Sequence, residues 1–399
     1  MATEKFGLLC YATGANEPDP AGYVLPEIHL NIWEQETSGK DGEEVFLDVG
    51  LMFSINESAK TIELIFPWKV NQSDIKDLSG VIGVSDAIPA IFNESWAVSD
   101  HGGDHVVYDP RQVARPGFSI VSVNKALFEK DHEAQWGTGS TLRTSKVHAI
   151  SINIDALTTK AKSAARATSR DVDRFYMRFR VLNVKRYFYC SDADNIKFDI
   201  STVLQQKTED LDFRLNVRRG APPNLAKDLG KFLEFSKVHL FLMRSRDKDI
   251  VFHDKLFKAA RSLEDEDFWA RYSLKDPTTA LQDGIDANRQ RVKDSLGYQW
   301  KSGGDGQPPV KEFGTLARFR IVKFAVWRFV IFALLLGVCG NVLLDIFKFG
   351  YSKWKPDGPV DAVCIKAGEG FTLPKQECVP SAKIDSAKGR FNGQTQKKD

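Results

Sequence analysis

The chain has 399 residues, and 42% of them are apolar, which is enough to bury one large core or two smaller ones. Its 55 basic residues are nearly balanced by 53 acidic ones. Because the net charge is only +2, no overall electrostatic field favours nucleic acid as a partner.

The first part of the chain has the pattern of β-structure. Residues 99–117 are dense in Gly, Asp and Pro, which predicts a loop. Loose alternation of apolar and polar residues predicts strands over residues 23–33, 45–55, 61–68 and 147–154. We therefore expect a β-rich N-terminal domain over residues 1–154.

A second domain, with both helices and strands, is expected over residues 155–300. Asp155 can cap a short helix that ends near Ser169. Aromatic and β-branched residues then predict strands over residues 174–190, 195–203 and 211–217, and a hairpin of residues 238–244 with 250–253. Helices are predicted over residues 254–263, 265–273 and 277–295.

The predicted fold is a mainly β (α+β) body of two sandwich-like units with a helical neck, followed by one C-terminal transmembrane helix. Residues 301–323 are expected to be a flexible Gly- and Pro-containing linker with a basic amphipathic juxtamembrane segment. The transmembrane helix is expected over residues 324–346, and residues 347–399 form a short extracytoplasmic tail.

The membrane prediction depends on an uncharged run of sixteen residues, Phe329 to Leu344. As a helix, residues 324–344 extend about 31 Å at about 1.5 Å per residue, close to a hydrocarbon thickness of about 30 Å. Trp327 and Arg328 stand near one end, and aromatic residues flank the other, as in membrane proteins. A core helix is rarely so apolar on every face, so the pattern favours a single membrane span.

The expected orientation places the N-terminus in the cytoplasm and the C-terminus outside. The first residues lack the basic start, apolar core and cleavage site of a secretory signal. Cys364 and Cys378 then lie in an oxidising compartment, where a disulfide between them would contribute about 3 kcal/mol. The alternative is two unrelated thiols.

Small residues follow one face of the predicted span. Ala333, Gly337 and Asn341 recur every four residues, and Gly340 lies beside them. Small side chains let helices approach closely, and an amide can hydrogen-bond across their interface. The stripe predicts a homo-oligomer formed through the span; a monomeric anchor is the alternative.

A histidine-containing segment, residues 99–105, is the sharpest polar cluster. His101, Asp104 and His105 could bind a divalent metal if Asp131, His132 or His148 completed the site. The segment also resembles a solvated glycine loop. No Gly-X-Ser-X-Gly motif is present, so a serine hydrolase lacks its nucleophile.

Two basic segments are candidate sites for a phosphorylated ligand. The glycine-rich loop at residues 136–146 lacks the Walker spacing, but Arg143 and Lys146 could still bind a phosphate. The second segment could bind a nucleotide or lipid headgroups, or simply present its basic face to solvent. Its basic residues are Lys160, Lys162, Arg166, Arg170, Arg174, Arg178, Arg180, Lys185 and Arg186.

No complete catalytic motif is present, so we do not expect an enzyme and expect no cofactor. The sequence favours a single-pass membrane-anchored recognition or sensor protein, whose cytoplasmic body binds a protein or a phosphorylated ligand. One alternative is an oligomerising effector that perturbs the bilayer, a plan found in bacterial defence systems. The other is a membrane-tethered hydrolase that uses a divalent metal at His101, Asp104 and His105.

Overall fold

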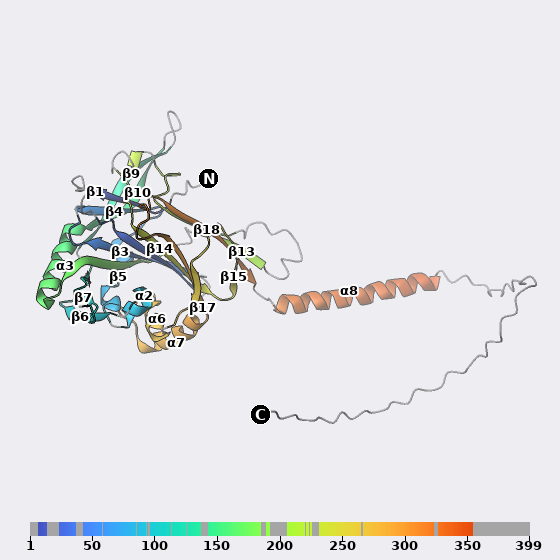
Figure 1. The fold of residues 1–399 in the computed structure, drawn as a ribbon. Coiled ribbons are helices and arrows are strands. Elements are labelled where there is room, and N and C mark those ends of the chain that lie inside the picture. The colour runs from blue at the N-terminus through green and yellow to red at the C-terminus, as the bar shows by residue number, and fades with distance from the viewer. Residues whose placement is uncertain are drawn as a thin grey trace, which may run out of the picture. The chain divides into compact units, whose positions relative to one another are not determined.

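The structure is a computed structural model, and its fold is shown in Figure 1. It describes residues 7–353 apart from a set of gaps. The gaps are residues 14–23, 37–42, 58, 85, 93, 95, 113, 125, 137–142, 185–188, 192–205, 220, 223, 226–230, 265 and 323–325. The chain divides into two units, residues 1–333 and residues 334–399.

The first unit is mainly β, as predicted, and its described strands form three sheets. The largest has the order β16 (Ala259–Ser262), β17 (Ser295–Gly303), β14 (Lys237–Ser245), β2 (Glu27–Glu36), β3 (Glu43–Ser54), β11 (Val172–Val181), β8 (Gly117–Ile120), β7 (Asp104–Tyr108) and β6 (Ala97–His101), with β5 (Ile75–Asp77) beside β11. The second has the order β1 (Leu9–Thr13), β4 (Thr61–Phe66), β10 (Arg143–Asn153) and β9 (Leu127–Trp136). The third has the order β12 (Tyr189–Ser191), β13 (Gln206–Leu215), β18 (Phe313–Val322) and β15 (Lys248–His253).

Short helices pack on the largest sheet. Helix α3 (Ile154–Thr168) begins at Asn153, whose side chain accepts a hydrogen bond from the Ala156 amide at 2.9 Å. Asp155, predicted as the cap, lies in its first turn instead. The other described helices of this unit are η1 (Gln72–Asp74), α1 (Ser79–Ile82), α2 (Ala87–Phe92), α6 (Glu266–Tyr272) and α7 (Gln282–Lys293).

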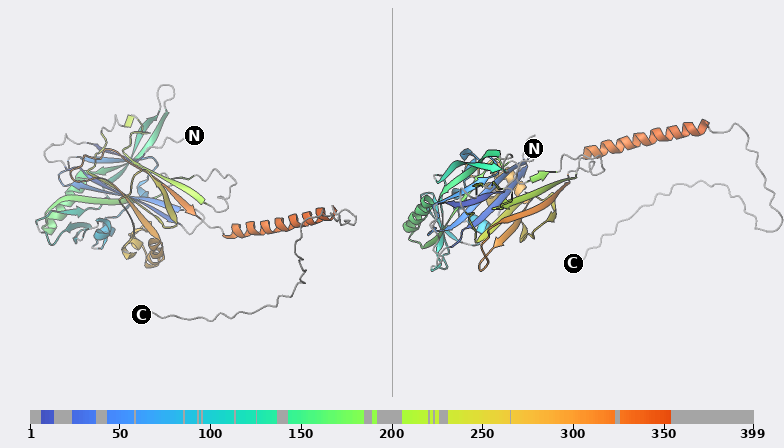
Figure 2. Two further views of the ribbon diagram at one scale, coloured as in Figure 1. Left: turned by 45° about the vertical axis from the view of Figure 1, so that its right-hand side comes forward. Right: turned by 90° about the horizontal axis from the view of Figure 1, so that it is seen from above.

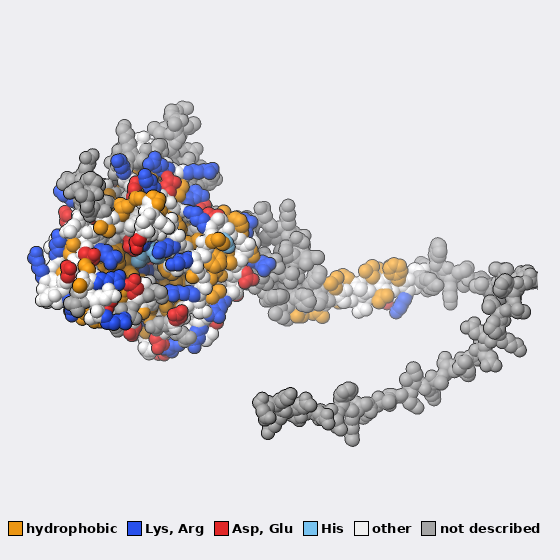
Figure 3. All heavy atoms as spheres, in the orientation of Figure 1, with side chains coloured by type: hydrophobic (Ala, Val, Ile, Leu, Met, Phe, Trp, Pro, Cys, Tyr) orange, Lys and Arg blue, Asp and Glu red, His pale blue; other side chains and the backbone are white. Residues whose placement is uncertain are grey.

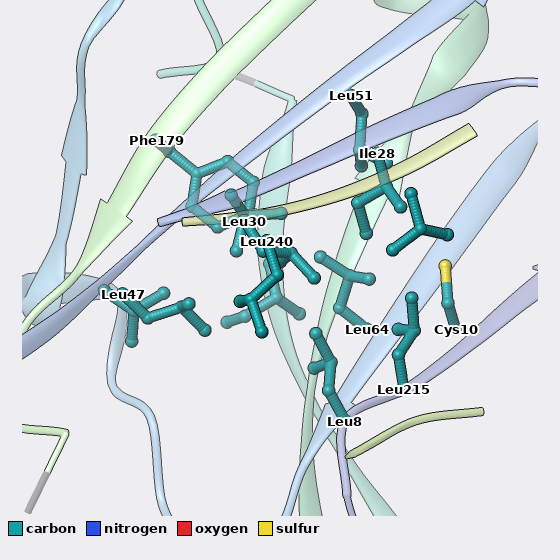
Figure 4. Packing of buried hydrophobic residues seen from close by; sticks show 14 of the residues in the cluster. Leu8, Cys10, Ile28, Leu30, Leu47, Leu51, Leu64, Phe179, Leu215 and Leu240 are labelled. Carbon is teal, nitrogen blue, oxygen red and sulfur yellow. The ribbon is translucent and has the colours of Figure 1, made fainter. Parts of the chain in front are cut away.

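The largest sheet is buried on both faces, which gives the unit three layers. One face packs against the two smaller sheets, so Leu30, Leu64 and Leu215 come from three different sheets and meet in one core (Figure 4). The opposite face carries Trp33 and Tyr176 and is covered by α1, α2, α6 and α7. Figures 1 and 2 show β4 and β10 on one side of β3 and β14, and α6 and α7 on the other.

Several details of the predicted fold are wrong. The strands β14 and β15 exist, but they do not form a hairpin: β14 pairs with β2 and β17, and β15 pairs with β18. Residues 259–262, expected in a helix, form strand β16. Helices α6 and α7 bury apolar residues on the sheet and are followed by β17 and β18, so they are not a neck.

A further detail is the segment before the apolar run. Residues 313–322 were expected to lie at the lipid surface, but they form strand β18 between β13 and β15. Alternation explains this, because Phe313, Ala317 and Phe319 are buried while Arg318 and Arg320 point to solvent. Sheet pairing also crosses the expected boundary at residues 154 and 155, since β11 pairs with β3.

The last described element is helix α8, Val326–Lys353. Within the part of the chain that the structure describes, no helix combines the length and the apolar character needed to span a membrane. The predicted disulfide residues Cys364 and Cys378 lie outside the described residues.

Candidate functional site

A network of buried charges lies on the helix-covered face of the largest sheet. Strands β3 and β11 are antiparallel and place Arg180 opposite Asp48. Both side chains are fully buried, and Arg180 donates two hydrogen bonds to the Asp48 carboxylate, at 2.6 and 3.0 Å. Tyr272 and Trp33 donate to the same carboxylate at 2.8 and 2.9 Å. The negative charge of Asp48 is therefore fully solvated by protein groups.

Arg178, two residues before Arg180 on β11, extends this network. Its guanidinium donates to the hydroxyls of Tyr272, at 2.5 Å, and of Tyr176, at 2.9 Å. Nη2 of Arg178 lies 3.8 Å from Asp48 and makes no hydrogen bond among the described residues. Arg178 is thus a fully buried cation with donor capacity to spare.

A small cavity lies beside Arg178. It has a volume of about 20 Å³, which is room for about one water molecule, and its lining includes Arg178, Asn31 and Trp269. Oδ1 of Asn31 is buried there without a hydrogen-bond partner among the described residues. One water molecule could accept from Arg178 and donate to Asn31, which would satisfy both.

Two histidines and a glutamate converge at the edge of the same face. Strands β2 and β14 are parallel and place His29 beside His239, with ring centroids 4.9 Å apart. Glu27 lies two residues before His29 and so points to the same side of β2. Within the described residues, these three are the one group of His, Cys, Asp or Glu side chains whose ligand atoms all come within 4.8 Å of one another.

The predicted metal ligands His101, Asp104 and His105 are arranged differently from Glu27, His29 and His239. His101 and Asp104 face each other at the end of the β6–β7 hairpin, whose turn is Gly102–Gly103 with φ of 61° and 87°. His101 is exposed, while His105 is buried against Gly83. Asp104 accepts a hydrogen bond from the Ser122 amide at 2.8 Å, so its carboxylate helps to fix the hairpin.

The other suggested ligands of that cluster lie on β9 and β10. His132 contacts Glu63 at 2.6 Å and His148 contacts Asp131 at 2.8 Å, in cross-strand pairs of their own. These contacts lie within the sheet of β9 and β10, which is not the sheet of His101, Asp104 and His105.

The predicted phosphate-binding residues are dispersed. Arg143 begins β10, and Lys146 is exposed further along that strand and pairs with Asp131 at 3.7 Å. Arg174 is partly exposed on β11, whereas Arg178 and Arg180 on the same face are buried under helices. The interpretation of this basic face as a solvent face is therefore wrong for those two residues. Lys185 and Arg186 lie outside the described residues.

A larger hollow lies near the start of β18. Its volume is about 910 Å³, within the range of small-molecule sites, about 300–1,000 Å³. Its basic lining residues are Arg218, Lys231 and Lys311, and its acidic ones are Glu234 and Glu312. Because Lys311 pairs with Glu234 at 3.5 Å, Arg218 and Lys231 give this groove its basic character.

The sequence alone predicted neither the histidine pair nor the groove. Glu27 and His29 give one usable signal in the sequence, because they are two residues apart on a predicted strand and so share one face of it. His239 lies 210 residues further along the chain, and no local pattern predicts that β14 pairs with β2. A scan against protein-family models finds no match for this chain, and a search of the curated proteins finds none either.

Proposed function

We propose that the chain is a recognition protein, attached to a bilayer by a single span over residues 324–346, whose body binds an anionic ligand. The exposed apolar surface of α8 carries the proposal. Ten of its described large apolar side chains are 38–74% exposed. They are Val330, Leu334, Leu336, Val338, Val342, Leu343, Leu344, Ile346, Phe347 and Phe349.

Such a surface is unfavourable in water, at about 25 cal/mol for each Å² of apolar area. A helix that is apolar on every side has no polar face to turn to solvent, which favours lipid over a globular partner. The apolar side chains of α8 are visible in Figure 3. Residues 324 and 325 and several side chains of α8 lie outside the described residues, so the proposed length of the span comes from the sequence.

The recognition part of the proposal comes from the groove. Arg218 and Lys231 offer cations to a phosphate or carboxylate ligand in a hollow of suitable volume. The groove residues 307–312 come directly before β18, and β18 leads into residues 324–346. A ligand in the groove would therefore contact the segment directly before β18, the strand that leads into the proposed membrane anchor.

Membrane attachment is tested by flotation of the expressed chain on a density gradient after alkaline extraction. We expect the wild type to float and the double variant Leu336→Lys, Leu343→Lys to remain with soluble protein. Leu281→Lys is a matched control, because Leu281 is 79% exposed in the first unit. A wild-type chain that stays soluble without detergent would contradict the anchor.

Ligand binding is tested by native mass spectrometry of the chain released from detergent. We expect an added mass on the wild type that is lost in Lys231→Glu, Arg218→Glu. The exposed residues Lys69 and Lys162 provide the control pair, Lys69→Glu with Lys162→Glu. The absence of added mass on the wild type, or its retention in the groove variant, would count against recognition at this groove.

An oligomerising effector is a second candidate function, favoured by the glycines of α8. A Cβ added to Gly337 or Gly340 would meet nothing within 4 Å, and Asn341 is exposed. No described neighbour therefore accounts for these small residues, whereas a second copy of the helix would.

We expect Gly337→Leu and Asn341→Leu to abolish dye leakage from vesicles while the body stays folded; unchanged leakage would exclude this function.

A further inference from the structure

The parallel pairing of β2 and β14 brings Glu27, His29 and His239 together at one edge of the helix-covered sheet face. His29 is 9% exposed and the Glu27 side chain is 18% exposed, so solvent reaches the group only partly. One carboxylate oxygen of Glu27 lies 3.9 Å from Nε2 of His29. The ligand atoms of all three side chains lie within 4.8 Å of one another, so small rotamer adjustments would bring them around one ion.

We propose that Glu27, His29 and His239 form a binding site for a divalent transition-metal cation of the zinc class. Two imidazoles and one carboxylate suit zinc, and three protein ligands leave a fourth position for water or a ligand atom. None of the three ligands belongs to α8 or lines the groove, so the assignment stands independently of the proposed function.

The outer contact of His29 supports this assignment. Nδ1 of His29 lies 3.4 Å from the hydroxyl of Tyr176, which also accepts the hydrogen bond from Arg178. Metal-binding histidines usually have one nitrogen oriented by such a contact, which leaves Nε2 for the metal. Nδ1 of His239 lies 3.4 Å from the Gln299 amide nitrogen, which is a donor, so metal binding at Nε2 of His239 requires the amide to rotate and accept from Nδ1 through its oxygen.

Lys237 is the internal competitor for Glu27. Its ammonium lies 3.2 Å from a Glu27 oxygen and 3.1 Å from a carboxylate oxygen of Asp305, which is 97% exposed. Metal binding would replace one contact of this ammonium and leave the other. The competition predicts that removing the ammonium strengthens metal binding.

The test is calorimetric titration of the dialysed full chain in detergent with Zn²⁺, with metal content measured by mass spectrometry. We expect one site per chain and at least 10-fold weaker binding in His29→Gln and in His239→Gln. His148→Gln is the matched control, since His148 pairs with Asp131 in another sheet. A wild type that does not bind Zn²⁺, or His239→Gln binding as tightly as the wild type, would overturn the site.

Two further measurements keep the test independent of any folding defect in those variants. Co²⁺ added to the wild type should give the visible absorption of a four- or five-coordinate histidine site; a spectrum of aqueous six-coordinate Co²⁺ would overturn the proposal. Lys237→Met should bind Zn²⁺ several-fold more tightly. Unchanged affinity in both Lys237→Met and Glu27→Gln would remove Glu27 from the site and overturn the three-ligand assignment.

Discussion

Burial determines how much each ion pair of this protein contributes to stability. The Asp48–Arg180 pair and the Asp210–Arg318 pair have similar two-point geometry, with the second pair at 2.6 and 2.8 Å. The first pair is fully buried, while the side chains of the second are 26% and 48% exposed. Water can replace a lost partner only in the second pair.

We therefore expect Asp48→Ala to lower the free energy of unfolding by about 3–5 kcal/mol, because it leaves Arg180 and Arg178 as buried cations without their carboxylate. Asp210→Ala should cost about 1 kcal/mol or less, as exposed pairs do. Denaturant unfolding of both variants measures the difference. Equal losses in the two variants would show that burial does not set the contribution.

The histidine pair predicts how stability depends on pH in the presence of a chelator. The pKa of His239 is about 3 in the folded chain, against an ordinary value of 6.5, and the pKa of His29 is lowered too. Below pH 6.5 the unfolded chain therefore binds protons that the folded chain does not. Stability should fall as the pH decreases, by up to about 1.4 kcal/mol per pH unit for each group.

Urea unfolding between pH 7 and pH 5 measures this slope. His239→Gln should reduce this slope by the contribution of nearly one proton, which is up to about 1.4 kcal/mol per pH unit. Glu27 adds to the slope only below its ordinary pKa of 4.5. Lys237 and Arg178, which face the pair, have raised pKa values and keep their charge throughout this range, so they leave the slope unchanged. An identical slope in the variant would show that His239 titrates normally.

At the scale of the elements, a glycine on β3 leaves room for the side chain of Tyr176 on the neighbouring strand β11. A Cβ added to Gly50 on β3 would lie 2.0 Å from the Tyr176 hydroxyl on β11. That hydroxyl contacts both His29 and Arg178, so Gly50 gives the tyrosine the space in which to connect them.

We expect Gly50→Ala to displace the Tyr176 ring and to cost about 1–3 kcal/mol, as overpacking does. Gly80→Ala is the control, because a Cβ there meets nothing within 4 Å and alanine favours the helix by about 1 kcal/mol. Thermal unfolding compares the two variants. A Gly50→Ala chain as stable as Gly80→Ala would show that the tyrosine can move without loss.

Several of the elements were predictable from the sequence, but their partners were not. Alternation of apolar residues predicted β3, β4 and the end of β10, and the aromatic run predicted β11. Such patterns depend on the solvent exposure of each face. They failed for Arg178 and Arg180, because helices α6 and α7, distant in sequence, cover that face of the sheet.

At the scale of the whole molecule, sheet pairing between distant segments builds the candidate sites. Strand β2 pairs with β14, and β13 pairs with β18 roughly 100 residues away. The ten-stranded sheet and the histidine pair depend on such pairings, which leave no local trace in the sequence. The apolar run at residues 329–344 is different, because its composition alone is the signal.

The place of β18 in its sheet predicts where the chain can be shortened. Phe313, Ala317 and Phe319 are buried in the main core, and β18 separates β13 from β15. A chain ending at residue 325 keeps this strand and should unfold cooperatively, with the melting temperature of the full-length body. A chain ending at residue 312 loses these three buried apolar side chains and two strand pairings, and should aggregate or unfold without cooperativity. Calorimetry of both chains tests this prediction. If residues 313–322 were a dispensable juxtamembrane segment, the two chains would have the same melting temperature.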